Sequence, residues 1–184
     1  MVKDRYDAVA ITLHWVIAFG IIMQIAVGLG MTHIQIPIGA KFWLYQFHKS
    51  VGITVLFAVV LRLLWRLTHT PPALPAAMPM LERRAASVTH LALYGFMLAL
   101  PLTGWALVSV SPYNIPTVLY GLIPWPDLPI LSTLPDKHAA DAVASFVHSR
   151  LGFILIGLLA LHIAAALRHH FLLHDNVLRR MLPF

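Results

Sequence analysis

The chain has 184 residues, of which 59% are hydrophobic and only 11% are charged, and its mean hydropathy is +0.79. An ordinary soluble domain has about 25% charged residues and a soluble helical bundle has polar outer faces on its helices, so this composition argues against a soluble protein. The formal net charge is +6, but the basic residues form no stripe with interleaved aromatic residues, so nucleic-acid binding has no support.

Four apolar segments follow one another along the chain, and each is long enough to cross a hydrocarbon core of about 30 Å as a helix. They cover residues 8–31, 47–67, 88–110 and 146–173, and all seven acidic residues fall outside them. We therefore expect an all-α fold in which residues 1–184 form a single membrane domain. Its architecture would be a transmembrane four-helix bundle in a lipid bilayer.

The basic residues predict the orientation of this bundle, because cytoplasmic loops carry an excess of Lys and Arg. Four spans place both chain ends on one side. That side holds nine basic residues and the opposite side holds four: Lys3, Arg5, Arg62, Arg66, Arg83, Arg84, Arg168, Arg179 and Arg180 against Lys41, Lys49, Lys137 and Arg150. The rule therefore predicts cytoplasmic N- and C-termini. No cleavable signal sequence is recognisable at the N-terminus, so the first span is expected to remain.

Two of the connections are rich in proline. The predicted cytoplasmic loop 68–86 carries four prolines and should be extended rather than helical. The predicted outer loop 111–145 combines six prolines with aromatic residues, and loops of that length are usually functional or disordered. We expect it to pack onto the outer mouth of the bundle. Within the third span, Pro101 should kink the helix.

The chain contains no cysteine. Covalently attached c-type haem and thiolate-held iron–sulfur clusters are thereby excluded, so a redox cofactor would need histidine ligands. Five of the eleven histidines fall in or at the ends of the spans: His14, His48, His90, His148 and His162. Ionisable residues within membrane spans are rare and usually functional.

His148 and His162 on the last span are separated by almost exactly four turns of a helix. At about 100° per residue the interval falls roughly 40° short of four full turns, so both rings share one face at levels about 21 Å apart. The depth of each span then places His48 beside His148 at an outer level. At the inner level, His14 and His90 compete to pair with His162. Two haems, each held by two histidines, would account for this arrangement.

A steric argument chooses between the inner candidates. A porphyrin against a ligand helix needs a small residue one turn after the histidine, because position i+4 lies on the same face. That position is Ala18, Gly52, Gly152 or Ala166 after four of the histidines, but Tyr94 after His90. The pattern favours His14–His162 and His48–His148. Small residues also serve as packing contacts in membrane helices, so His90 stays open as an inner ligand.

Three different roles for the histidines fit the pattern less well. Hydrogen bonds to neighbouring carbonyls would explain one of them, but not four at two matched levels. A zinc site would need three or four ligands around one point, usually with a cysteine or a carboxylate among them. A proton pump would normally carry Asp or Glu in its spans, and here the spans contain neither.

Three basic residues are candidates for assisting roles. Arg62 follows His48 at the same interval that separates His148 and His162, and so reaches the inner level. It would either pair with a haem propionate or extend to the membrane interface. Lys49 and Arg150 flank the outer histidines. With Lys41 and Lys137 they would make the outer mouth positive, and this charge would either neutralise haem propionates or attract a small anion.

Several motifs carry a resemblance over essentially the whole chain. They are T-L-H-W at 12–15, H-K-S-V-G at 48–52, R-L-L-W-R-L-T-H-T-P-P at 62–72, L-P-L-T-G at 100–104, H-S-R-L-G at 148–152 and the tail at 167–183. Together they resemble the bacterial cytochrome b561 family. The resemblance implies a multi-pass protein of the bacterial inner membrane with two haem b groups, ligated by His14 and His162 and by His48 and His148.

The resemblance also implies electron transfer between an outer-side partner and membrane quinone. Some members of the family are described as superoxide oxidases, which oxidise periplasmic superoxide and reduce ubiquinone. For this chain we expect Lys49 and Arg150 to steer superoxide to the outer haem, and His90 to bind quinone or relay protons. The alternative is a cytochrome b subunit that serves a dehydrogenase or another periplasmic partner protein.

Overall fold

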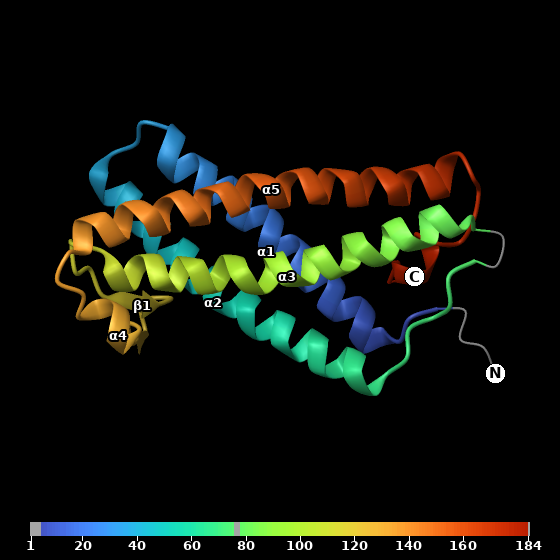
Figure 1. Cartoon of the computed structure of the whole chain (residues 1–184), viewed down its shortest axis with the longest axis horizontal. Helices are drawn as coiled ribbons and strands as arrows, with labels where there is room; N and C mark the ends of the chain where they lie inside the picture. Colours follow the sequence, from blue (N-terminus) through green and yellow to red (C-terminus); the bar gives the residue numbers. More distant parts are fainter. Residues whose placement is uncertain (1–4, 76–77, 184) are drawn as a thin grey trace.

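The computed structural model describes residues 5–75 and 78–183, and most of them are helical (Figure 1). Each of the four long helices is long and apolar enough to cross a membrane, as the sequence predicted. Lys3, one of the basic residues used for the orientation, lies outside the described residues. The elements are α1 (Ala8–His33), α2 (Ile38–Thr68), α3 (Met80–Val110), β1 (Thr117–Leu119), β2 (Ile123–Trp125), α4 (Pro129–Ser132), α5 (Lys137–Phe171) and the 3-10 helix η1 (Arg179–Met181).

Three of the long helices begin eight or nine residues before the apolar segments predicted from the sequence. α2 starts at Ile38 rather than 47, α3 at Met80 rather than 88, and α5 at Lys137 rather than 146. Hydropathy identifies only the apolar part of a helix. The helix itself begins at a polar turn outside that part, where a capping group can satisfy its first N–H groups. For α5 the cap is Asp136, whose carboxylate accepts the Ala139 N–H at 3.0 Å. The loops are correspondingly shorter than expected.

The helices pack in the sequence α1–α2–α3–α5. Gly20 lets α1 approach α2 closely, since a Cβ at this position would lie 2.8 Å from Val55 Cγ2. Within the described residues, α5 packs along α3 and makes no comparable packing with α1 or α2. This leaves space on the face of α5 that carries His148 and His162. The buried core consists of Ile17, Ile21, Val51, Val55, Val59 and Leu155.

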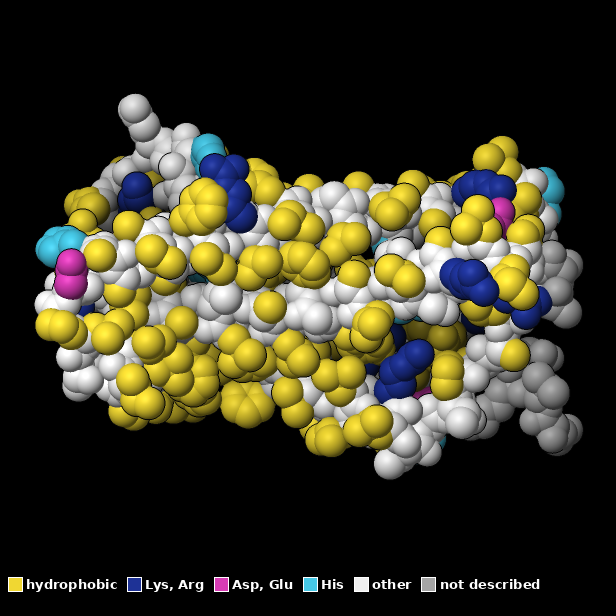
Figure 2. Space-filling view, in the orientation of Figure 1, with side chains coloured by type: hydrophobic (Ala, Val, Ile, Leu, Met, Phe, Trp, Pro, Cys, Tyr) yellow, Lys and Arg dark blue, Asp and Glu magenta, His cyan; other side chains and the backbone are white. Residues whose placement is uncertain are grey.

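The outer surface of the bundle is apolar. Along the middle of the face in Figure 2, hydrophobic side chains predominate, and most charged side chains lie toward the two ends. Large apolar side chains such as Phe19 and Leu91 are 68% and 75% exposed. A soluble protein would bury such residues, so this surface is suited to contact with lipid.

One end of the bundle, here called the outer end, is covered by the segment between α3 and α5. Its β1–β2 hairpin turns at Gly121, which has a φ of +73°. A polar strip on α2 holds the hairpin: Gln46 Nε2 donates to the Pro116 carbonyl at 2.8 Å, and Ser50 Oγ accepts the Tyr120 N–H at 2.9 Å. The segment therefore packs onto the bundle, as its aromatic content predicted.

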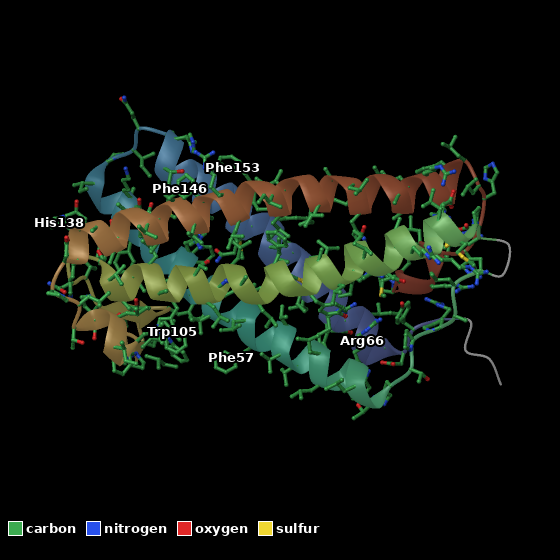
Figure 3. All side chains as sticks on the ribbon, in the orientation of Figure 1. Phe57, Arg66, Trp105, His138, Phe146 and Phe153 are labelled. Carbon is green, nitrogen blue, oxygen red and sulfur yellow. The ribbon has the colours of Figure 1, made fainter. Side chains whose placement is uncertain are left out.

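An aromatic cluster completes this outer contact. The Trp125 ring of β2 lies 5.4 Å from that of Trp105 on α3 and 6.0 Å from that of Phe57 on α2, measured between centroids. Figure 3 labels Trp105 and Phe57, which lie next to the hairpin segment. The Trp105 indole also donates to the Pro126 carbonyl at 2.9 Å. These contacts fix the outer segment against α2 and α3.

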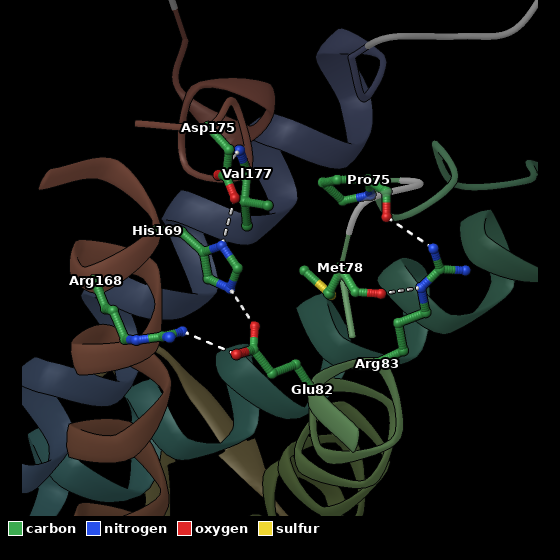
Figure 4. A network of polar contacts seen from close by, with 8 residues as sticks. All are labelled: Pro75, Met78, Glu82, Arg83, Arg168, His169, Asp175 and Val177. Carbon is green, nitrogen blue, oxygen red and sulfur yellow. Dashed lines mark hydrogen bonds and ion pairs between the residues drawn. The ribbon is translucent and has the colours of Figure 1, made fainter. Parts of the chain in front are cut away.

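The first and last residues that the structure describes meet at the opposite, inner end of the bundle. Arg5 Nη2 donates to the Leu182 carbonyl at 2.7 Å, and the Trp15 indole donates to the Met181 carbonyl at 2.7 Å. A polar network then ties the C-terminal segment to the helices (Figure 4). In this network Glu82 of α3 lies 3.3 Å from Arg168 and 4.0 Å from His169 of α5.

Candidate cofactor site

The outer level brings together His48 from α2 and His148 from α5. Their ring centroids are 6.3 Å apart and their planes meet at 85°. An imidazole nitrogen binds a metal ion at about 2.0–2.1 Å, so two rings on opposite sides of one ion have centroids roughly 6 Å apart. The outer pair therefore has a separation at which both rings would reach one metal ion, although α2 and α5 do not pack along each other.

A cavity of about 860 Å³ opens beside this pair and is lined by both rings. This is within the usual size of a cofactor site, about 300–1,000 Å³. Gly152, one turn after His148, lines the cavity, and a Cβ at this position would meet nothing within 4 Å. Gly52 also lines it, but Gln24 Nε2 already lies 3.0 Å from the position of a Cβ there. The open space expected one turn after each histidine is therefore present at Gly152, whereas at Gly52 the Gln24 side chain occupies it.

Glycines on neighbouring helices make room for the rings themselves. A Cβ at Gly28 of α1 would lie 3.3 Å from His48 Cε1, and one at Gly104 of α3 would lie 3.1 Å from His148 Cε1. Both are closer than ordinary van der Waals contact, so each imidazole rests against bare backbone. The sequence did not predict a role for these two glycines. Each was a glycine inside an apolar span, which in membrane helices usually indicates close packing, and Gly104 also ended the L-P-L-T-G motif.

The two outer histidines differ in their hydrogen bonds. His148 Nδ1 lies 3.1 Å from Thr103 Oγ1. His48 Nδ1 is buried and, within the described residues, has no hydrogen-bond partner. Beside it, Gln24 Nε2 donates to the His48 carbonyl at 2.9 Å, while Gln24 Oε1 is buried and unpaired. Unsatisfied polar atoms at this depth are costly, so their presence next to an apolar cavity indicates a site built for a bound group.

At the inner level the structure brings three histidines together. His14 of α1 and His162 of α5 have centroids 6.3 Å apart and planes at 64°, and His90 of α3 lies 5.8 Å from His162 with planes at 66°. The His14–His162 separation matches that of the outer pair. The two inner separations are too similar for distance alone to decide which ring pairs with His162.

Arg62 of α2 lies near all three rings of this inner cluster. Its Nη1 donates to the Ala10 carbonyl at 2.8 Å and its Nε to the Tyr94 hydroxyl at 3.2 Å. The tyrosine one turn after His90 is therefore the hydrogen-bond partner of the arginine. The sequence had left open whether Arg62 extends to the membrane interface. In the structure its guanidinium instead bonds groups of α1 and α3.

Next to Arg62, Asp7 fixes the start of α1 just outside the span. Its Oδ1 accepts the Ala10 N–H at 2.9 Å and the Trp65 indole N–H at 3.0 Å. Burial by itself raises the pKa of the Asp7 carboxyl, but these hydrogen bonds outweigh it and hold that pKa below its usual value. A carboxylate that stays ionised at neutral pH stabilises the helix N-terminus.

Of the residues predicted to attract an anion, two line the outer cavity and two lie outside its lining. Lys41 and Lys49 line the outer cavity, and Lys49 Nζ lies 3.4 Å from the Ile115 carbonyl. The Arg150 guanidinium is instead exposed and lies 5.1 Å from the centre of the Phe146 ring (labelled in Figure 3), outside the residues that line the cavity. Lys137 donates to Asn114 Oδ1 at 2.6 Å. Among the described residues, Lys41 and Lys49 are thus the lysine or arginine side chains that line the outer cavity.

Fold and site together define a class of protein: a chain with four membrane-spanning helices in which histidines of separate helices face each other at two levels along α5. The profile of the prokaryotic cytochrome b561 family matches residues 5–184. The chain belongs to this family. Membership implies haem b as cofactor, and the outer site fits that group by its ring separation and its cavity.

Individual proteins with cytochrome b561 or related names match this chain over nearly its full length. The chain is 34% identical to cytochrome b561 homolog 2 of Escherichia coli (strain K12), over 97% of this chain and 92% of that protein. It is 28% identical to cytochrome b561 homolog 1 of the same organism, over 98% of both chains. It is 29% identical to the probable superoxide oxidase CybB of Yersinia pestis, over 97% of this chain and 96% of that protein.

Proposed function

We propose that the chain holds two haem b groups, one between His48 and His148 and one between His14 and His162. It would transfer electrons from periplasmic superoxide to ubiquinone in the bacterial inner membrane. The observation that carries this proposal is the equal separation of the two histidine pairs, 6.3 Å in each case, at two levels along one face of α5. The relative named as a probable superoxide oxidase supports the choice of donor.

The chain contributes binding, orientation and charge to this reaction. When bound, haem b supplies an iron centre that takes up and releases one electron at a time. Lys41 and Lys49 at the outer cavity raise the local concentration of an anionic substrate. Arg150, exposed beside Phe146, adds to the field from a greater distance.

At the inner level, Arg62 offers a guanidinium to a haem propionate, since its planar fork suits a carboxylate. His90 would bind a quinone carbonyl or relay a proton to the reduced quinone. The overall reaction balances when two superoxide ions each lose one electron and leave as dioxygen. Ubiquinone takes up those two electrons together with two protons and becomes ubiquinol.

This function requires the end that holds both chain termini to face the cytoplasm. The excess of Lys and Arg at that end supports the orientation. The outer cavity and its two lysines then open toward the periplasm. Superoxide and ubiquinone would meet the protein at different depths, and the two histidine levels would connect them.

The purified protein, mixed with an enzymatic superoxide source and a short-chain ubiquinone, tests the proposal. We expect rapid haem reduction and quinol formation by the isolated chain, and we expect superoxide dismutase to abolish both. Haems that stay oxidised until a second protein is added would contradict the proposal and favour a cytochrome b subunit. The His148→Ala variant is the matched control, because it should lose the response to superoxide while the protein stays folded.

A further inference from the structure

Two residues of the L-P-L-T-G motif at 100–104 lie against the ring of His148. Thr103 Oγ1 lies 3.1 Å from His148 Nδ1, and a Cβ at Gly104 would lie 3.1 Å from His148 Cε1. We propose that Thr103 is a positioning residue, which holds the proton of His148 on Nδ1 and thereby lowers the reduction potential of the outer haem. This inference rests on the proposed ligation of that haem by His148.

The direction of the hydrogen bond follows from counting protons. A threonine hydroxyl has one hydrogen to donate and two lone pairs to accept with. The hydroxyl of Thr103 donates its hydrogen to the Leu100 carbonyl at 2.9 Å. Its oxygen can therefore act only as an acceptor toward His148, so the hydrogen between them belongs to Nδ1.

A proton on Nδ1 also suits the proposed ligation of iron by His148. Nε2 then keeps its lone pair, which is the form of imidazole that binds iron.

Gly104 allows this contact to form. A Cβ at Gly104 would lie 3.1 Å from His148 Cε1 and 3.6 Å from Nδ1. Any side chain there would displace the ring and lengthen its bond to Thr103. The glycine and the threonine of the motif therefore act together, one by leaving space for the imidazole and the other by fixing its tautomer.

The partner ring provides a contrast within the same pair. His48 Nδ1 is buried and has no hydrogen-bond partner among the described residues. A ligating imidazole whose other nitrogen donates to an acceptor is more basic and a stronger donor to the metal. His148 is therefore the stronger ligand of the outer pair, and its bond to Thr103 favours oxidised over reduced iron.

The test is a spectroscopic redox titration of the purified holoprotein and of its Thr103→Val variant, which removes the hydroxyl and keeps the shape. We expect the outer haem of the variant to be easier to reduce. At a fixed ambient potential its ratio of reduced to oxidised iron should rise by about tenfold, which is a shift of about 59 mV for one electron. The inner haem should keep its potential. In Thr103→Ser, which keeps the hydroxyl, the outer haem should have the potential of the wild type.

Thr68→Val is a matched control, because the Thr68 hydroxyl also bonds a carbonyl of its own helix and the ring of His69, which is not a proposed ligand. It should move neither potential. If Thr103→Val keeps both haems and leaves the outer potential unchanged or lower, the inference is wrong. If Thr103→Val loses the outer haem, the titration is repeated on Thr103→Ala. The reduction potential of its outer haem must then be higher than in the wild type, and an unchanged potential would also contradict the inference. A wild-type protein without haem would contradict the proposed function itself.

Discussion

The rings of His48 and His148 face each other at 6.3 Å with their planes at 85°, although they belong to helices that do not pack along each other. Both rings line the outer cavity. The proposed haem b would be held there by these two imidazoles.

The crossed planes of the outer pair predict a spectroscopic property of the oxidised protein. Each imidazole interacts most strongly with the iron d orbital that is perpendicular to its own plane, so crossed rings keep two of these orbitals close in energy. We expect a highly anisotropic low-spin ferric signal in the electron paramagnetic resonance spectrum. The inner pair, with planes at 64°, should be less anisotropic. A signal typical of parallel rings at the outer haem would contradict this geometry.

Removing single histidines should remove single haems. His148→Ala should lose the outer haem and retain the inner one, and His14→Ala should do the reverse, because each substitution leaves the other pair intact. Haem content per chain, together with the redox titration curve, measures both losses. Loss of both haems from either variant, with the chain still folded, would show that the two sites are not independent.

His90 is the critical control for the inner site. Its ring lies 5.8 Å from that of His162, against 6.3 Å for His14 and His162. If His14 is the ligand, His90→Ala keeps both haems and alters only quinone reduction. If His90→Ala loses the inner haem, the choice of His14 from its small neighbour Ala18 is wrong.

The lysines at the outer cavity should control the rate at which superoxide arrives. Lys49→Gln removes a positive charge from the cavity wall, and we expect the second-order rate constant with superoxide to fall by about threefold at low salt. High salt should reduce the difference, because ions screen the field. Arg150→Gln should have a smaller effect, since that guanidinium lies over Phe146 outside the cavity lining. Equal effects of the two variants would contradict a role for the cavity lysines in particular.

The contact between Asp175 and His169 should make the inner end sensitive to acid. Burial by itself raises the pKa of the Asp175 carboxyl, but hydrogen bonds from the Val177 N–H and His169, together with the charge of Arg180, lower it below its usual 3.8. A lowered pKa means that the carboxylate stabilises the fold above about pH 4 and that this contribution is lost as the pH falls further.

The matching experiment is thermal unfolding of Asp175→Asn in detergent. At pH 7 we expect a loss of about 1 kcal/mol, the usual value for one hydrogen bond, and a smaller difference from the wild type at pH 3. Asp127→Asn, which changes an exposed carboxylate in the outer segment, is the control and should change little. A difference for Asp175→Asn that is the same at both pH values would argue against an ionic role for this contact.

The spans and the two histidine levels were predictable from the sequence, because both depend on helical periodicity within a single segment. The interval between His148 and His162 fixes their shared face without knowledge of any other helix. The helix starts were placed too late, since hydropathy does not register the polar turns that extend α5 back to Lys137. The β1–β2 hairpin was also missed, because each of its strands is only three residues long.

The groups that support the histidines were not predictable in the same way. The contact of Thr103 with His148 and that of Gln24 with the His48 carbonyl join different helices. They depend on how each helix is rotated against its neighbour, which a single sequence does not reveal. Gln24 did carry a signal, because an amide inside an apolar span needs a partner.

The most direct test of the account is the amount of haem b bound per chain in protein purified from haem-replete cells. The account predicts two haems per chain, both low-spin and resolved as two components in a redox titration, because His48–His148 and His14–His162 each have the separation that one iron requires. A folded, colourless protein, or one that binds a single haem at saturation, would contradict it.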